Sequence, residues 1–198
     1  MDMLKTYKLL LCIGAGLMLG ACSSSSYSGM QLTEADFKNM FRDHTWYMST
    51  IHAVYADGTY GMEDLRAHWV GGYVGVNFVC DNDSLYEYKG CFIAGLHTFE
   101  YYRPGTTYEY DAKSHTLSLK NLELSRYEKL RELEVVYISK DSMLCFSPII
   151  DNVRKDSLAV KSLITFKAKD IPSDFRDMIL DEKSANEKIN QLNEYEYE

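Results

Sequence analysis

The sequence of 198 residues predicts an all-β protein, an antiparallel barrel of eight or nine strands with a short helix before it and another helix after it. Three observations carry this prediction. Short stretches rich in β-branched and aromatic residues follow one another, with turn signals between them. The three prolines, Pro104, Pro148 and Pro172, lie outside the predicted strand interiors. The chain also has no internal repeat of fixed period, which argues against a solenoid or a propeller.

Residues 1–21 have the features of a secretory signal peptide. Lys5 and Lys8 give a positive start, and residues 9–21 form an apolar stretch that ends in small residues. This stretch is too short for a membrane-spanning helix, which needs about 20 apolar residues. We therefore assign it to targeting and exclude it from the fold.

The end of this stretch, Leu19-Gly20-Ala21-Cys22, resembles the lipobox of bacterial lipoprotein precursors. The resemblance implies cleavage between Ala21 and Cys22 and acylation of Cys22. The alternative is an ordinary signal peptide that ends beside an incidental cysteine. Several acyl chains give a stable membrane anchor, because each buried CH₂ contributes about 0.8 kcal/mol.

Residues 22–30 are predicted to form the lipidated cysteine and a flexible tether. The seven residues from Ser23 to Gly29 span at most about 25 Å when fully extended, so the folded domain stays near the membrane. The resemblance also implies a location. Ser23, rather than aspartate, follows the cysteine and favours the outer membrane, and the lack of an acidic cluster in the tether favours its periplasmic face.

The charge of the mature chain limits its partners. Without residues 1–21, which carry two lysines and one aspartate, 177 residues remain, with 19 basic and 28 acidic side chains. Nucleic-acid binding normally requires a basic surface, so we expect no nucleic-acid partner. A surface with a net charge of −9 does not attract anionic lipids either, and the acyl chains are the predicted contact with the membrane.

Residues 31–169 are predicted to form the barrel domain. Thr33 is expected to cap a helix that ends near residue 41. The predicted strands are 45–55, 69–80, 84–88, 106–110, 116–119, 130–139, 143–147 and 158–169, and 91–102 is either a strand or a packed loop. In residues 170–198, Ser173 is expected to cap a C-terminal helix that starts over 174–180. The helix either ends there or continues past Ile189 and Leu192, and an acidic tail follows it.

This pattern resembles the lipocalin-like domains of small bacterial lipoproteins. The resemblance rests on the leading helix and on five stretches: His44-Thr45-Trp46, Asp57-Gly58, Tyr108-Glu109-Tyr110-Asp111, Leu117-Ser118-Leu119, and residues 137–144. In the family, the tryptophan closes one end of the barrel and a basic residue of the last strand covers it. The resemblance therefore implies this role for Trp46, with Lys167 or Lys169 as its cover. The alternative for Trp46 is core packing alone.

The cysteines allow one disulfide. Cys80, Cys91 and Cys145 remain after Cys12 and Cys22 are accounted for, and Cys80–Cys91 is the pair nearest in sequence. Free cysteine also packs as a small apolar side chain, so the alternative is three buried thiols.

The sequence contains no motif that indicates catalysis. It has no nucleophile elbow or phosphate-binding loop, and its five histidines are scattered. We therefore expect neither enzymatic activity nor a cofactor or metal. Among the sixteen tyrosines, Tyr86, Tyr88, Tyr108 and Tyr110 are candidates for ligand or glycan contact. The alternative is that tyrosine simply suits half-exposed strands.

Two function classes remain. The first is a membrane-anchored, non-catalytic binding module that holds a small apolar or amphipathic ligand in its barrel. The second is an interaction or structural protein with a filled barrel, which docks on another envelope protein or a glycan through a tyrosine-rich face. An inhibitor or adhesion module is a weaker third class, since the fold alone does not determine function.

Overall fold

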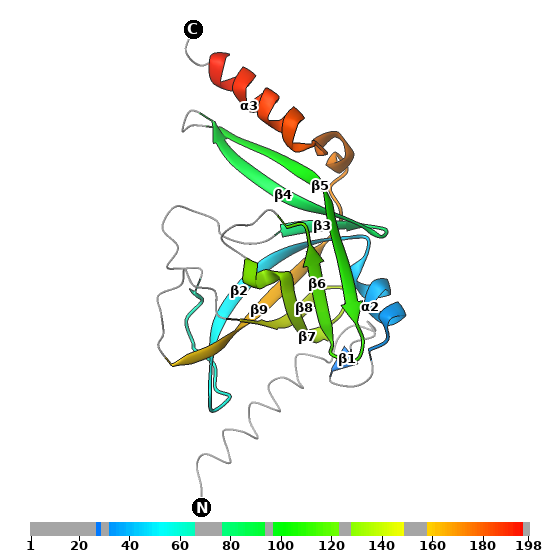
Figure 1. The fold of residues 1–198 in the computed structure, drawn as a ribbon, viewed down its shortest axis with the longest axis vertical. Helices are drawn as coiled ribbons and strands as arrows, with labels where there is room; N and C mark the ends of the chain where they lie inside the picture. Colours follow the sequence, from blue (N-terminus) through cyan, green and yellow to red (C-terminus); the bar gives the residue numbers. More distant parts are fainter. Residues whose placement is uncertain are drawn as a thin grey trace, which may run out of the picture.

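Eight strands form a closed antiparallel barrel, which confirms the predicted fold class (Figure 1). The computed structural model describes residues 27–28, 32–65, 77–93, 97–122, 128–148 and 158–195. Each barrel strand pairs with its neighbours in the sequence, and the last strand closes the barrel on the first. The strands are β2 (His44–Tyr55), β3 (Asn77–Asp81), β4 (Ser84–Ile93), β5 (His97–Asp111), β6 (Thr116–Lys120), β7 (Glu132–Ile138), β8 (Ser142–Ser147) and β9 (Ala159–Lys169). This architecture is consistent with a lipocalin-like fold.

A two-residue strand precedes the barrel. β1 (Tyr27–Ser28) pairs with the end of β7, where Tyr27 lies opposite Ile138. The pairing fixes the start of the described chain to one side of the barrel. Residues 1–26, including the predicted cleavage site at Ala21 and the predicted lipidated Cys22, lie outside the described residues.

Two strands, β4 and β5, are longer than the sequence predicts. β5 continues through Pro104, where the sequence analysis expects a break between two stretches. The register explains the difference, because Leu85 lies opposite Thr106 while Glu87 lies opposite Arg103. This shift places Pro104 and Gly105 in a bulge, where a proline is tolerated within a sheet. Gly105 has a φ of 98°, a conformation that glycine adopts without steric cost.

A helix closes one end of the barrel. α2 (Glu34–Phe41) begins at the predicted cap, where the Thr33 hydroxyl accepts a hydrogen bond from the Asp36 backbone N–H. Its apolar face buries Phe37, Met40 and Phe41. The Phe41 ring stacks on Trp46 with 5.6 Å between centroids, and the Trp46 indole N–H donates to the Phe41 carbonyl at 2.7 Å. The helix therefore belongs to the barrel core.

The predicted C-terminal helix is present, but it begins later than expected and has a different cap. Ser173 does not cap a helix over 174–180; instead a short 3₁₀ helix, η3 (Phe175–Met178), precedes α3 (Glu182–Tyr195). The Asp181 carboxylate accepts a hydrogen bond of 2.7 Å from the Ser184 backbone N–H and so caps α3. Another 3₁₀ helix, η2 (Glu128–Arg131), leads into β7. In the part of the chain described here, no helix is long and apolar enough to span a bilayer.

Two ribbons extend beyond the barrel. The first, called the arm, consists of residues 88–93 of β4 and 97–103 of β5, and the pairing of β5 with β6 begins only at Thr107. The second ribbon consists of the end of β2, beyond its pairing with β3, and the start of β9. Tyr55 lies opposite Ala159 at its far end. Figure 1 shows the arm pointing upward beside α3, and the β2–β9 ribbon ending at the lower edge of the ribbon drawing.

Candidate functional site

The four predicted contact tyrosines do not share one face. Strand residues alternate between the two faces of a sheet, so the register assigns each tyrosine to one side. Leu85 is in the barrel core, and therefore Tyr86 and Tyr88 take the outer-face positions next to it. Tyr108 and Tyr110 pack with the barrel core. The structure thus separates the predicted set into an outer pair and an inner pair.

The outer pair packs against the C-terminal segment. The Tyr86 ring meets Phe175 of η3 edge-on at 5.1 Å between centroids, and Tyr102 meets the same ring at 4.9 Å. Together with Val79, these rings form a second, smaller core outside the barrel. Burial raises the pKa of the Tyr88 hydroxyl. The outer tyrosines therefore hold η3 on the sheet and do not form an open aromatic face.

The inner pair fills the end of the barrel that α2 closes. The Tyr110 ring stacks on Phe37 with 4.1 Å between centroids, and its hydroxyl lies 3.0 Å from the Nδ1 atom of His115. Tyr108 lies against Phe41 at 4.9 Å. Burial is the main cause that raises the pKa of Tyr110 to about 12. Both rings act as core side chains, which is the alternative that the sequence left open.

Trp46 lies inside the barrel at its α2 end, fully buried. The predicted cover by Lys167 is wrong. Lys167 is exposed and lies opposite Tyr47, whereas Ala168 is the residue opposite Trp46. The ammonium group of Lys169 lies 4.7 Å from the centre of the Tyr47 ring, so it is also on the outer side. The carbonyl of Phe41 provides the polar partner of Trp46 instead.

The predicted disulfide between Cys80 and Cys91 is also wrong. Cys80 is a free, buried thiol that lies opposite Leu85, and Cys91 follows six residues further along β4. At about 3.3 Å per residue, the Cα atoms of Cys80 and Cys91 are about 20 Å apart. A disulfide requires Cα atoms within roughly 7 Å of each other. Burial raises the pKa of Cys80 to about 12 and also raises that of Cys145. These two cysteines are inert core side chains.

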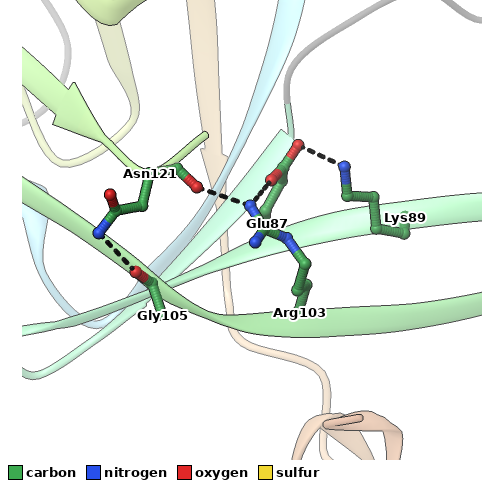
Figure 2. A network of polar contacts seen from close by, with 5 residues as sticks. All are labelled: Glu87, Lys89, Arg103, Gly105 and Asn121. Carbon is green, nitrogen blue, oxygen red and sulfur yellow. Dashed lines mark hydrogen bonds and ion pairs between the residues drawn. The ribbon is translucent and has the colours of Figure 1, made fainter. Parts of the chain in front are cut away.

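The sequence analysis missed a buried charged network on the barrel wall. Glu87 is 1% exposed, and its partner Arg103 donates from Nη2 to the Glu87 Oε2 atom at 2.7 Å. The Lys89 ammonium lies 2.9 Å from the other carboxylate oxygen. Figure 2 shows both cations converging on Glu87. Because Glu87 lies opposite the core residue Phe78, its side chain takes an inner-face position.

The bulge in β5 builds this network. Asn121 follows the end of β6 in the left-handed conformation, with a φ of 62°, and its side-chain amide donates to the Gly105 carbonyl at 3.3 Å. The Asn121 carbonyl in turn accepts a hydrogen bond of 2.7 Å from Arg103 (Figure 2). Asn121 thereby joins the bulge to the guanidinium. The Pro104-Gly105 dipeptide, read as an interruption of a strand, is the sequence signal that marks the place.

A buried hydroxyl lies on the same wall. Thr106 is 3% exposed, and its Oγ1 atom has no hydrogen-bond partner among the described residues. Its register partner is Leu85, two positions before Glu87. Arg103 and Lys89 bring two cationic groups to this wall. Cationic groups and a hydroxyl donor are the groups that bind a carboxylate or another anionic group.

The network and α2 contact different parts of β5. Arg103 precedes the part of β5 that pairs with β6, whereas Tyr110, which contacts α2, lies near the other end of that strand. Across the sheet the two are closer, because Phe78, which lies opposite Glu87, meets the Phe41 ring of α2 at 5.6 Å between centroids. Among the described residues, no group of three or more histidine, cysteine or acidic side chains is arranged to hold a metal ion.

Comparison of the chain with known protein families, with curated proteins and with solved structures finds no match. The function is therefore inferred from the fold and from the geometry of this network.

Proposed function

We propose that this chain is a lipid-anchored envelope protein whose barrel binds a small amphipathic ligand with an acidic head group. The buried network of Glu87, Arg103 and Lys89 is the observation that carries the proposal. In this proposal the head group lies against Arg103 and Lys89, and the Thr106 hydroxyl donates a hydrogen bond to it. The ligand is held without a cofactor and without chemical change.

The energetics of burial support a binding role for the network. Moving charged groups out of water costs several kcal/mol per ion, and an apolar replacement of similar volume is often as stable as a buried ion pair. The side chains of Arg103 and Lys89 are only 14% and 19% exposed. A buried charged group inside an otherwise apolar barrel is therefore a candidate functional feature.

The neighbouring residues suit the apolar part of such a ligand. Phe78 lies opposite Glu87, and Leu85 lies opposite Thr106, so apolar and polar side chains alternate along the same inner wall. The α2 end is already filled by Phe37, Phe41 and Trp46. The proposed ligand is accordingly short, with its apolar part on the wall between the network and this aromatic cluster.

The lipobox-like Leu19-Gly20-Ala21-Cys22 supports the anchoring part of the proposal. In it, the mature protein begins at Cys22, attaches through acyl chains and faces the periplasm from the outer membrane. Ligand binding in the barrel then takes place close to the lipid surface, since the tether is short.

Native mass spectrometry tests the ligand-binding part. The soluble form starting at Ser23, purified from its own host, is compared with the Arg103→Gln and Thr106→Val variants and with Lys113→Gln, a control at an exposed turn. We expect a retained small acid in the parent and in Lys113→Gln, and its loss in Arg103→Gln. A clean apo mass for the parent would contradict the proposal.

A second candidate function is a filled-barrel interaction protein that docks on another envelope protein. The tightly packed α2 end favours it, because a barrel filled by its own side chains holds less ligand. The same mass-spectrometry experiment separates the two candidates. An apo mass, combined with a specific crosslink to one envelope protein in intact cells, would support the interaction function.

A further inference from the structure

The end of the β2–β9 ribbon exposes large apolar side chains. We call Tyr60, Met62, Leu158 and Val160 the tip, and they are 48%, 97%, 72% and 54% exposed. Tyr60 bridges to Val54 on one edge of β2, and Leu158 and Val160 flank Ala159, which lies opposite Tyr55 on the other edge. The four residues therefore belong to the segments near the end of one ribbon.

The backbone of the tip is well ordered. The Gly58 N–H donates to the Tyr55 carbonyl at 2.9 Å, and the Gly61 N–H donates to the Ala53 carbonyl at 2.9 Å. The Asp57 carboxylate accepts hydrogen bonds from the backbone N–H and the hydroxyl of Thr59. These bonds hold the backbone of the turn that carries Tyr60 and precedes Met62, which lowers the backbone entropy lost when the turn binds a surface.

The proposed anchor is attached on the same side of the molecule as the tip. Tyr27 in β1 lies five positions after Cys22, and a chain of that length spans at most about 18 Å. Figure 1 shows β1 and the end of the β2–β9 ribbon at the lower end of the folded body, while α3 lies at the upper end of the long axis. An acylated Cys22 therefore holds this lower end close to the bilayer.

We propose that the tip inserts into the lipid surface as a second membrane contact. This inference rests on the lipidation described under the proposed function. Met62, Leu158 and Val160 suit the boundary of the acyl chains, and Tyr60 suits the head-group level, where an apolar ring with a polar hydroxyl is favoured.

Charge selects the kind of lipid. The predicted mature chain has an excess of acidic groups, with a net charge of −9. Anionic head groups are therefore repelled, and the tip is matched to a neutral surface such as phosphatidylcholine or phosphatidylethanolamine.

Tryptophan quenching tests the inference. The full chain, expressed with its own leader and purified from membranes, is reconstituted in phosphatidylcholine vesicles with or without brominated acyl chains. The variant Met62→Trp is compared with Glu187→Trp, a matched exposed position on α3, and the emission of the parent is subtracted from both. We expect a blue shift and a loss of emission at position 62, and neither change at position 187.

The outcomes separate this inference from the lipidation on which it rests. If the protein floats with the vesicles and the mass of the Cys22 peptide shows acylation, but position 62 is not quenched, the tip contact is wrong and the anchor stands. A loss of quenching when Leu158→Ser is added to Met62→Trp would support the contact further. An unmodified Cys22 would overturn the anchor, and the inferred contact together with it.

Discussion

Two ribbons extend from the same barrel, and they differ in how much of their surface the rest of the chain covers. The arm of β4 and β5 is covered on one face by η3, whose Phe175 packs against Tyr102 of the arm and against Tyr86 just before it. The β2–β9 ribbon ends in a hairpin turn with Met62 97% exposed. Among the described residues, a second core of buried side chains lies on the outer face of the first ribbon.

The difference shows where aromatic residues contribute stability and where they remain available for contact. The tyrosines of the arm are occupied by the C-terminal segment, so they hold the fold together. The side chains of the tip contribute little to the core and can be changed without unfolding the barrel. Variants that remove the cover of the arm or the apolar groups of the tip should therefore have very different effects.

The largest expected effect is that of Phe175→Ala. Phe175 is 2% exposed, and a buried Phe→Ala change typically lowers the free energy of unfolding by about 3–5 kcal/mol. We expect faster amide exchange in the arm and in η3, with β6, β7 and β8 still protected. Leu192→Ala on α3, where the side chain is 37% exposed, is the control. Equal loss of protection in the barrel strands would show that the arm is not a separate unit.

Glu87→Gln tests how much the charged network of Glu87, Arg103 and Lys89 stabilises the fold. Breaking a buried ion pair by removing one partner costs about 3–5 kcal/mol, and the residual exposure of Arg103 and Lys89 lowers this to an expected loss of about 2 kcal/mol in urea unfolding. The double variant Glu87→Met with Arg103→Met should recover most of the loss. A double variant as unstable as the single one would mean that the pair is not the source of the effect.

The cap of α3 gives a smaller, pH-dependent effect. Hydrogen bonds from Ser184, first from its backbone N–H, lower the pKa of the Asp181 carboxyl. A group with a lowered folded-state pKa stabilises the fold above its unfolded pKa of about 3.9, and that contribution is lost as the pH falls through the folded value. We therefore expect the first turn of α3 to lose amide protection below about pH 4. Asp181→Ala should lose this protection already at pH 7, and the neighbouring Glu182→Gln should not.

The smallest effect on stability is expected at the tip. Met62→Ser with Leu158→Ser removes exposed side chains, and such surface changes usually alter the free energy of unfolding by less than about 0.5 kcal/mol each. The melting temperature in solution should stay close to that of the parent. A clear loss of stability would show that these side chains support the ribbon, and the comparison between the two ribbons would no longer hold.

Much of the barrel can be predicted from local patterns. The Thr33 cap, the strand that starts near Trp46 and the last strand before residue 169 agree with the structure, because turn residues and alternation mark them clearly. The continuous path of β5 through Pro104 was missed, since a bulge is a property of the pairing with β4 and not of β5 alone. In place of a helix over 174–180, the structure has the 3₁₀ helix η3, in which Phe175 packs against Val79 and Tyr102 on the sheet.

The candidate site was much harder to predict. Alternation shows that Tyr86 and Glu87 face opposite sides, but not which of the two faces the barrel interior. That choice depends on the pairing of Glu87 with Phe78 and Arg103, which lie 9 and 16 residues away. The same limit applies to Cys80 and Cys91: nearness in the sequence suggested a bond that the register of β3 and β4 forbids.

The closure of the barrel also has a kinetic consequence. The pairing of Thr45 with Lys169 joins residues that are 124 positions apart, and contacts so distant in sequence form slowly because a long loop must first close. During synthesis, β2 lacks the neighbour along its β9 edge until nearly the whole chain has been made. A chain that ends before Ala159 leaves both β2 and β8 with an open edge. Completion of the barrel is thus an all-or-none event that waits for the final strand.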